Sequence, residues 1–243
     1  MQWLHDAAAW LPGQVETLEV SALMATPVAI DPQHPLMLEG ALGCAVIAAV
    51  TGRTPDEVGL GASTFVDLPI PIADGEREGC KVARASQAAG EGLGVVRYIR
   101  KRTRSEALGL AKVVEVAEFK AFNLPVVAKL YSVLRWCVFG DGAKLEQLLR
   151  LVHALGRGRQ GGLGAVQGWR VRPAASDWSW TKDGQPTRPL PVSSRAAAVA
   201  EFGPRAEVAR IGYRAPYWHP AVSRLCAVPP LPGYDGECSE VES

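Results

Sequence analysis

Residues 155–164 read LGRGRQGGLG, with five glycines and two arginines in ten positions. Glycine allows the backbone to adopt positive φ and lets a ligand approach main-chain N–H groups closely. Arginine adds a permanent charge and a planar fork of donors that suits phosphate. The stretch therefore predicts a loop that binds a polyanion, with Arg157 and Arg159 on phosphates. The N–H groups of Gly161 and Gly162 are expected within reach of ligand oxygens. The alternative is a flexible connection between a helix and a strand.

The order of elements around this loop excludes a dinucleotide site. Residues 156–161 match G-x-G-x-x-G, but that fingerprint must follow a strand and open a helix. Here the helical pattern comes first, at 142–155, with Asp141 as its N-cap and Gly156 as its C-cap. A strand pattern at 165–171 follows the loop.

The composition indicates a chain long enough for a sizeable hydrophobic core. With 243 residues and 48% apolar residues, we expect one large domain or two small ones. The start of the chain lacks the pattern of a signal peptide, and the most apolar window, 41–50, is too short to span a bilayer. We therefore expect a cytoplasmic protein with no membrane partner. The five cysteines include no C-x-x-C, and no D-x-D or H-x-H cluster occurs, so neither metal nor cofactor is predicted.

The charge is distributed unevenly along the chain. Residues 1–80 carry 2 basic and 11 acidic side chains, whereas residues 81–172 carry 17 basic and 6 acidic ones. A segment at +11 that contains the glycine loop is typical of a nucleic-acid-binding surface. Its densest part predicts an RNA-contacting ribbon with Tyr98 between the basic residues, although a solvated charged strand end is the alternative. The basic residues concerned are Arg97, Arg100, Lys101, Arg102, Arg104 and, further on, Lys120.

The remaining patterns predict an α+β fold. Strands are expected at 18–26 and 131–139, the latter central in a sheet because it is apolar on both faces, and a helix at 36–50 that stops at Gly52. Together with the elements around the glycine loop they predict a β-α-β unit. We expect a domain over 1–172 with a basic insertion at about 81–120. The rest, 173–243, is expected to be an irregular layer rich in proline and aromatic residues that packs on the sheet and ends in an acidic tail.

Four blocks of sequence carry a family resemblance. They are PLMLEGAL at 35–42, GD at 140–141 leading into LGRGRQGGLGAV at 155–166, RPLP at 188–191, and PYW at 216–218. Together with the β-α-β unit, they resemble the RAMP superfamily of CRISPR proteins. In this order they resemble the small RAMP subunit of type IV CRISPR effector complexes, the Cas-five-like subunit that caps the crRNA 5′ handle.

The resemblance implies an RRM-like, ferredoxin-like fold and a non-catalytic scaffold. The implied partners are crRNA, the backbone and large subunits of the effector complex, and the target DNA duplex near the PAM, which the subunit would help to position. In guide complexes the protein holds the nucleic-acid backbone and base pairing reads the target. Besides the basic run, the residues expected to bind RNA are Arg157, Gly158, Arg159, Gln160, Gly161, Gly162, Arg188, Tyr217 and Trp218.

Two other functions remain open from the sequence. A metal-independent crRNA-processing ribonuclease of the same superfamily would need a histidine as general acid or base. The four histidines, His5, His34, His153 and His219, form no recognisable motif. A plain RNA-binding module outside CRISPR is the third reading. Tyr217 and Trp218 are equally well explained as a core aromatic pair that holds the C-terminal layer.

Overall fold

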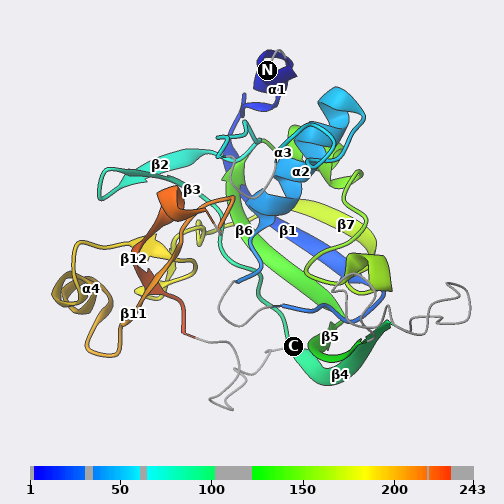
Figure 1. Cartoon of the computed structure of the whole chain (residues 1–243). Helices are drawn as coiled ribbons and strands as arrows, with labels where there is room; N and C mark the ends of the chain where they lie inside the picture. The colour runs from blue at the N-terminus through cyan, green and yellow to red at the C-terminus, as the bar shows by residue number, and fades with distance from the viewer. Residues whose placement is uncertain (1–2, 31–34, 61–64, 102–121, 218, 231–243) are drawn as a thin grey trace, which may run out of the picture.

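Strand β1 (Glu16–Met24) lies at the centre of the main sheet (Figure 1). It pairs antiparallel with β6 (Val133–Gly140) on one side and with β7 (Val166–Pro173) on the other. The computed structural model describes residues 3–30, 35–60, 65–101, 122–217 and 219–230. The three predicted strands are confirmed, and the chain is a mixed α+β protein. The strand predicted at 131–139 has neighbours on both sides, as expected of a central strand: β1 on one side and the segment at 85–89 on the other. Its burial alternates along the strand, so it is not apolar on both faces.

The outer edge of β6 is covered by a short extended segment. Ala85 and Ala89 form antiparallel bridges to Val138 and Arg135. The chain order of these pieces is β1, the segment at 85–89, β6 and β7. Their order across the sheet is β7, β1, β6 and then this segment. Strands β6 and β7 are parallel to each other because each is antiparallel to β1.

Two helices pack on one face of this sheet. The predicted helix at 36–50 is confirmed as α2 (Leu38–Thr51), which is followed by Gly52 as its C-cap. Helix α3 (Gly142–Leu149) lies between β6 and β7 in the chain. Alternate residues of β1 enter one core with both helices, as the period of a half-buried strand requires. This core includes Leu18, Val20 and Ala22 of β1, Leu38, Leu42 and Val46 of α2, and Leu145, Leu148 and Leu149 of α3.

Helix α3 is shorter than the sequence predicted. It ends at Leu149 instead of reaching 155, so Gly156 is not its C-cap. The amides of Leu151 and Val152 close tight turns onto the carbonyls of Leu148 and Leu149. The chain beyond this turn is extended, and it bridges to β7 through Val166. Val152 and Leu155 fit the helical spacing of apolar residues because they are buried as well, although their backbone is extended.

Helix α3 begins where the sequence predicted, after the N-cap Asp141. Replacing Asp141 with alanine is expected to lower the free energy of unfolding by about 1–2 kcal/mol. Its carboxylate accepts from the amides of Lys144 (3.1 Å) and Gly13 (3.0 Å). Burial alone would raise the pKa of Asp141, but backbone hydrogen bonds from Gly13, Lys144 and Gln14 together lower it below its ordinary value. The contribution is therefore present above the unfolded pKa and is lost as the pH falls through the folded value.

Urea unfolding of Asp141→Ala at neutral pH checks this expectation. The difference from the parent should shrink as the pH is lowered through the folded pKa of Asp141, because protonation removes the cap from the parent as well. A difference that stays constant with pH would contradict the role of the carboxylate.

Two hairpins and a short N-terminal helix complete the first part of the chain. Helix α1 (Trp3–Ala7) continues into η1 (Ala8–Trp10). Strands β2 (Asp74–Arg77) and β3 (Cys80–Ala83) form one antiparallel pair. Strands β4 (Gly92–Lys101) and β5 (Phe122–Tyr131) form a longer ribbon. The ribbon falls within the predicted basic insertion, and residues 102–121 lie outside the described part.

The C-terminal layer is more regular than the sequence predicted. It contains a three-stranded antiparallel sheet of order β10-β12-β11 and a hydrophobic cluster of its own, including Leu190, Phe202 and Cys226. Its elements are β8 (Thr181–Lys182), β9 (Gln185–Pro186), β10 (Leu190–Pro191), α4 (Arg195–Phe202), β11 (Glu207–Gly212), η5 (Pro220–Val222) and β12 (Ser223–Val228). Within the ranges described, no helix is long and apolar enough to cross a membrane.

Candidate nucleic-acid interface

The glycine loop is closed at its neck and pinned to the segment that follows β1. The amide of Leu155 donates to the carbonyl of Gly164 (2.8 Å), and the amide of Gly164 donates to that of Pro27 (2.8 Å). The amide of Arg157 donates to the carbonyl of Ala29 (3.0 Å). These bonds fix the position of the loop and argue against the alternative of a flexible connection.

Two glycines of the loop are required by close backbone packing. Gly156 has φ 76°, and a Cβ there would lie 2.6 Å from the carbonyl oxygen of Ala29. Gly164 has φ 71°, and a Cβ there would overlap the carbonyl oxygen of Leu155. Part of the glycine content thus serves the neck of the loop instead of a ligand.

Gly164→Ala is expected to destabilise the protein by at least about 1–3 kcal/mol from backbone strain, with the steric overlap in addition. Gly161→Ala is the matched control, because nothing lies within 4 Å of a Cβ at that position. Its effect should stay within about 0.5 kcal/mol. Urea unfolding of the two variants measures the difference. Equal stability of both would show that the neck is loosely held.

The tip of the loop is a 3-10 turn, η4 (Arg159–Gly161). The amide of Gly161 donates to the carbonyl of Gly158 (2.8 Å), and the amide of Gly162 donates to that of Arg159 (3.0 Å). The expectation that these two amides reach RNA oxygens is therefore wrong for this conformation, because both donors are used inside the loop. Gln160 lies within the same turn.

The arginines of the loop, in contrast, are on its surface. Arg157 and Arg159 are both exposed, and Arg159 also lines a pocket described below. The loop presents charge through side chains, in agreement with that part of the prediction.

The structure brings the glycine loop and the base of the β4–β5 ribbon together. Val28 and Lys129 of β5 exchange amide hydrogen bonds of 2.8 and 2.9 Å, while the next residue, Ala29, bonds to the loop. Ala29, Ala128 and Leu163 form a small buried cluster between them. The two features that the sequence singled out as basic therefore flank one short segment.

The predicted basic run is only partly within the described chain. Arg97, Arg100 and Lys101 lie on β4, in register with Val126, Asn123 and Phe122 of β5. Arg102, Arg104 and Lys120 lie outside the described residues, as does Trp218.

Arg188 is an interior residue, which removes it from any RNA interface. Its side chain is fully buried, and its guanidinium donates to the carbonyls of Ala83, Ala85 and Tyr213. Its Nη1 also lies 2.7 Å from Glu39 Oε1, an ion pair without the alignment of a hydrogen bond. No local sequence pattern indicated this carboxylate partner, which lies on α2.

Tyr217 is bound to the same carboxylate. Its hydroxyl donates to Glu39 Oε2 (2.9 Å). Burial raises the pKa of Tyr217 well above its ordinary value, and the charge of Glu39 raises it further. The phenol therefore remains a protonated donor, as the core alternative expected. Arg188, Glu39 and Tyr217 join the C-terminal layer to α2.

A basic surface that sequence reasoning missed lies on the sheet face opposite α2 and α3. Ser21 of β1 is in register with both Arg135 of β6 and Arg170 of β7. Directly opposite residues have Cβ atoms about 5 Å apart, so the two arginines flank Ser21 in one row. Arg172 lies two positions along β7 on the same face. We call Arg135, Arg170 and Arg172 the arginine face.

The arginine face keeps an excess of positive charge at the surface. All three side chains are exposed. Glu19 is the carboxylate beside them; it lies 3.9 Å from Arg135 and accepts a hydrogen bond from Ser21. The side chains of Arg170 and Arg172 make no ion pair with any described residue.

An exposed aromatic side chain adjoins this face. Trp178 is 39% exposed, and the ammonium of Lys182 lies 4.3 Å from its ring centroid. Arg84 lies 4.0 Å from the ring centroid of Phe139 on β6 and forms an ion pair with Asp177, the residue before Trp178, which places this segment beside β6. Cys137 pairs with Glu19, and Glu19 pairs with Arg172. Basic groups beside an aromatic platform are what a single-stranded nucleic acid requires.

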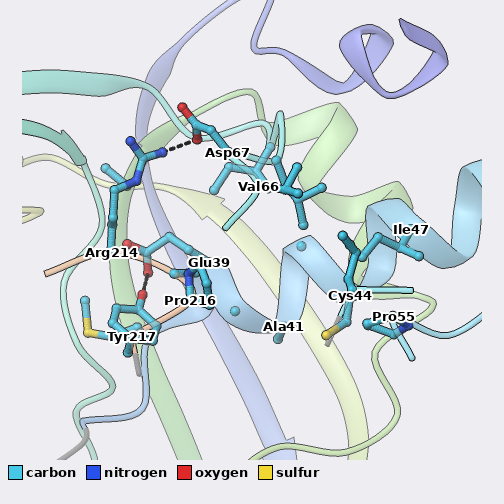
Figure 2. Close-up of a pocket in the computed structure, with 18 of the residues that line it drawn as sticks. Glu39, Ala41, Cys44, Ile47, Pro55, Val66, Asp67, Arg214, Pro216 and Tyr217 are labelled. Carbon is cyan, nitrogen blue, oxygen red and sulfur yellow. Dashed lines mark hydrogen bonds and ion pairs between the residues drawn. The ribbon is translucent and has the colours of Figure 1, made fainter. Parts of the chain in front are cut away.

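A pocket of about 580 Å³ lies along α2 (Figure 2). We call it the α2 pocket. It is bounded by one face of α2, by the segment at 66–70, by the segment at 214–217 and by the neck of the glycine loop. Three of the four sequence blocks that carry the resemblance contribute to its wall, and Arg188 of the fourth is paired with Glu39 in that wall.

The histidines lie in different places. His153 is an exposed residue in the segment after α3, and it is not on the helix as predicted. The His219 ring lies 5.4 Å from that of Phe65, and its Nδ1 accepts from the amide of Ala221. His5 is on α1, and His34 is outside the described chain. Among the residues with described positions, no three His, Cys, Asp or Glu side chains cluster as metal ligands would.

Sequence comparisons with known proteins found no relative of this chain. No protein-family model matches the chain, and no curated protein matches it in sequence. The resemblance to the type IV subunit therefore rests on the four sequence blocks.

Proposed function

We propose that this chain is an RNA-binding, non-catalytic protein that holds single-stranded RNA on its basic surfaces. The observation that carries the proposal is the arginine face, where Arg135, Arg170 and Arg172 are exposed and, within the described part of the chain, only Arg135 forms an ion pair, with Glu19 at 3.9 Å. Arginine side chains on a sheet bind phosphates, and an adjacent tryptophan offers a stacking surface for a base. The contact between the glycine loop and the base of the β4–β5 ribbon supports a second basic surface, one that combines the loop with the ribbon.

The finer proposal is a cytoplasmic subunit of a type IV CRISPR ribonucleoprotein that caps the 5′ handle of the crRNA. Its partners would be the crRNA, the backbone and large subunits, and target DNA near the PAM. The strand order supports a ferredoxin-like arrangement, since two parallel strands joined by α3 flank β1 and the segment at 85–89 takes the outer position. The convergence of the four sequence blocks on the α2 pocket also supports the proposal.

Purification of the tagged chain from cells that express its neighbouring genes, followed by RNA sequencing, tests this function. We expect a ribonucleoprotein with several subunits and RNAs that share a common 5′ handle. Binding of heterogeneous RNA without other subunits would favour a plain RNA-binding module. Specific cleavage of repeat RNA by the purified protein without metal would show the ribonuclease instead.

A further inference from the structure

The α2 pocket has a flat floor because of the small residues on one face of the helix. Gly40, Ala41 and Cys44 line the pocket and are partly exposed, and none of them has a large side chain. Gly43 is buried on the same helix, because Leu68 packs directly against it. A Cβ at Gly40 would meet only the Tyr217 ring, at 3.8 Å. The opposite side of the helix is buried against the sheet through Leu42 and its neighbours. A floor of such small residues accommodates a planar group.

The walls of the pocket combine apolar surface with a paired set of charges. Leu68 and Pro216 contribute apolar surface from two different segments. On the rim, Arg214 is ion-paired with Asp67, and Lys81 lies 2.9 Å from Asp74 and 3.4 Å from Asp67 (Figure 2 shows the first pair). The Arg214 side chain is largely buried and that of Lys81 is exposed, and together with the two carboxylates they offer both donors and acceptors to a ligand. A purely aliphatic ligand would have to desolvate them without replacing their hydrogen bonds.

One cation of the pocket has no carboxylate partner among the described residues. Arg159, from the tip of the glycine loop, lines the pocket and forms no ion pair in the part of the chain that the structure describes. Arg159 lines the pocket together with Cys44, so this arginine lies beside the floor. Burial raises the pKa of the Cys44 thiol, the charge of Arg159 lowers it, and the charge of Asp56 raises it. With the other pocket charges paired, Arg159 gives the site a preference for an anionic group.

We infer that the α2 pocket binds a single nucleotide, with the base on the floor formed by Gly40, Ala41 and Cys44 and the phosphate on Arg159. The inference rests on the proposed function, because the nucleotide is taken to be an unstacked unit of the bound RNA. A pocket of about 580 Å³ is within the range of small-ligand sites and has room for a base and its sugar phosphate. The floor extends along α2 from Glu39 to Cys44. These residues are five positions apart, so the floor is about 7.5 Å long.

Binding of the four ribonucleoside 5′-monophosphates, measured by saturation-transfer NMR and calorimetry, tests the inference. The parent should bind at least one of them about tenfold more tightly than the matching nucleoside, as one charge-assisted contact provides. Inorganic phosphate alone should bind weakly. Arg159→Gln, on an exposed side chain, should remove the advantage of the nucleotide over the nucleoside without changing the melting temperature.

Gly40→Leu should abolish binding of both nucleotide and nucleoside by filling the floor. Ala49→Leu is the matched control, because Ala49 is exposed on the same helix and does not line the pocket. It should bind as the parent does.

Two results would overturn the inference. One is a parent that binds single-stranded RNA but no mononucleotide, with Arg159→Gln and Gly40→Leu binding RNA as the parent does; the proposed function would then stand. The other is a parent that binds neither RNA nor mononucleotides, in which case both fail. Equal binding of inorganic phosphate and nucleotide would also contradict the base-binding floor.

Discussion

Arg188→Met is expected to lower the free energy of unfolding by about 3–5 kcal/mol, because it leaves a buried carboxylate without its cation. Glu39 is only 3% exposed. The substitution also removes the donor from the carbonyls of Ala83, Ala85 and Tyr213, and each unsatisfied buried acceptor adds to the loss. Urea unfolding followed by circular dichroism measures the change.

Two comparisons make this result specific. Arg195→Met removes an exposed arginine at the start of α4 and should change stability by less than about 0.5 kcal/mol. The double variant Glu39→Leu with Arg188→Met should be less destabilised than Arg188→Met alone, because it also removes the uncompensated charge. If Arg188→Met kept the parental stability but lost RNA affinity, Arg188 would be an RNA ligand and its interior placement would be wrong.

Replacing all three residues of the arginine face with glutamine is expected to weaken RNA binding by about a hundredfold at 0.1 M salt. Each phosphate contact on a single strand contributes roughly 0.7 to the log–log salt slope, which is about 0.7 decades of affinity at that salt concentration. Fluorescence anisotropy with a labelled single-stranded RNA measures the affinity. Stability should change little, since Arg135, Arg170 and Arg172 are exposed.

A charge-matched control is available on the C-terminal layer. Arg195, Arg205 and Arg210 are also exposed, and their replacement with glutamine removes the same net charge. This variant should lose far less affinity than the arginine-face variant. An equal loss would show that only overall charge matters, and that the arginine face is no specific site.

Local patterns predicted the elements of the main sheet and its helices. The alternation in β1, the apolar run of α2 and the N-cap at Asp141 each depend on neighbours in sequence, and all three are confirmed. The end of α3 was misplaced because Val152 and Leu155 are buried from an extended chain as well as they would be from a helix. Periodicity alone does not separate these cases.

The sites depend on pairings that no local pattern contains. Arg170 and Arg172 are two residues apart on one strand and therefore share a face, but their proximity to Arg135 follows from the register of β1 with both neighbours. Arg188 resembled a surface cation because its partner, Glu39, is distant in sequence. The glycine loop was recognised as exceptional, yet its amides close its own turn, which composition does not show.

The salt dependence of RNA binding, compared between the parent and the arginine-face variant, tests the central claim most directly. A plot of log affinity against log salt should be steeper for the parent by roughly 2, the sum of three phosphate contacts. Parallel lines of equal affinity, or a parent that shows no saturable RNA binding even at low salt, would contradict the claim.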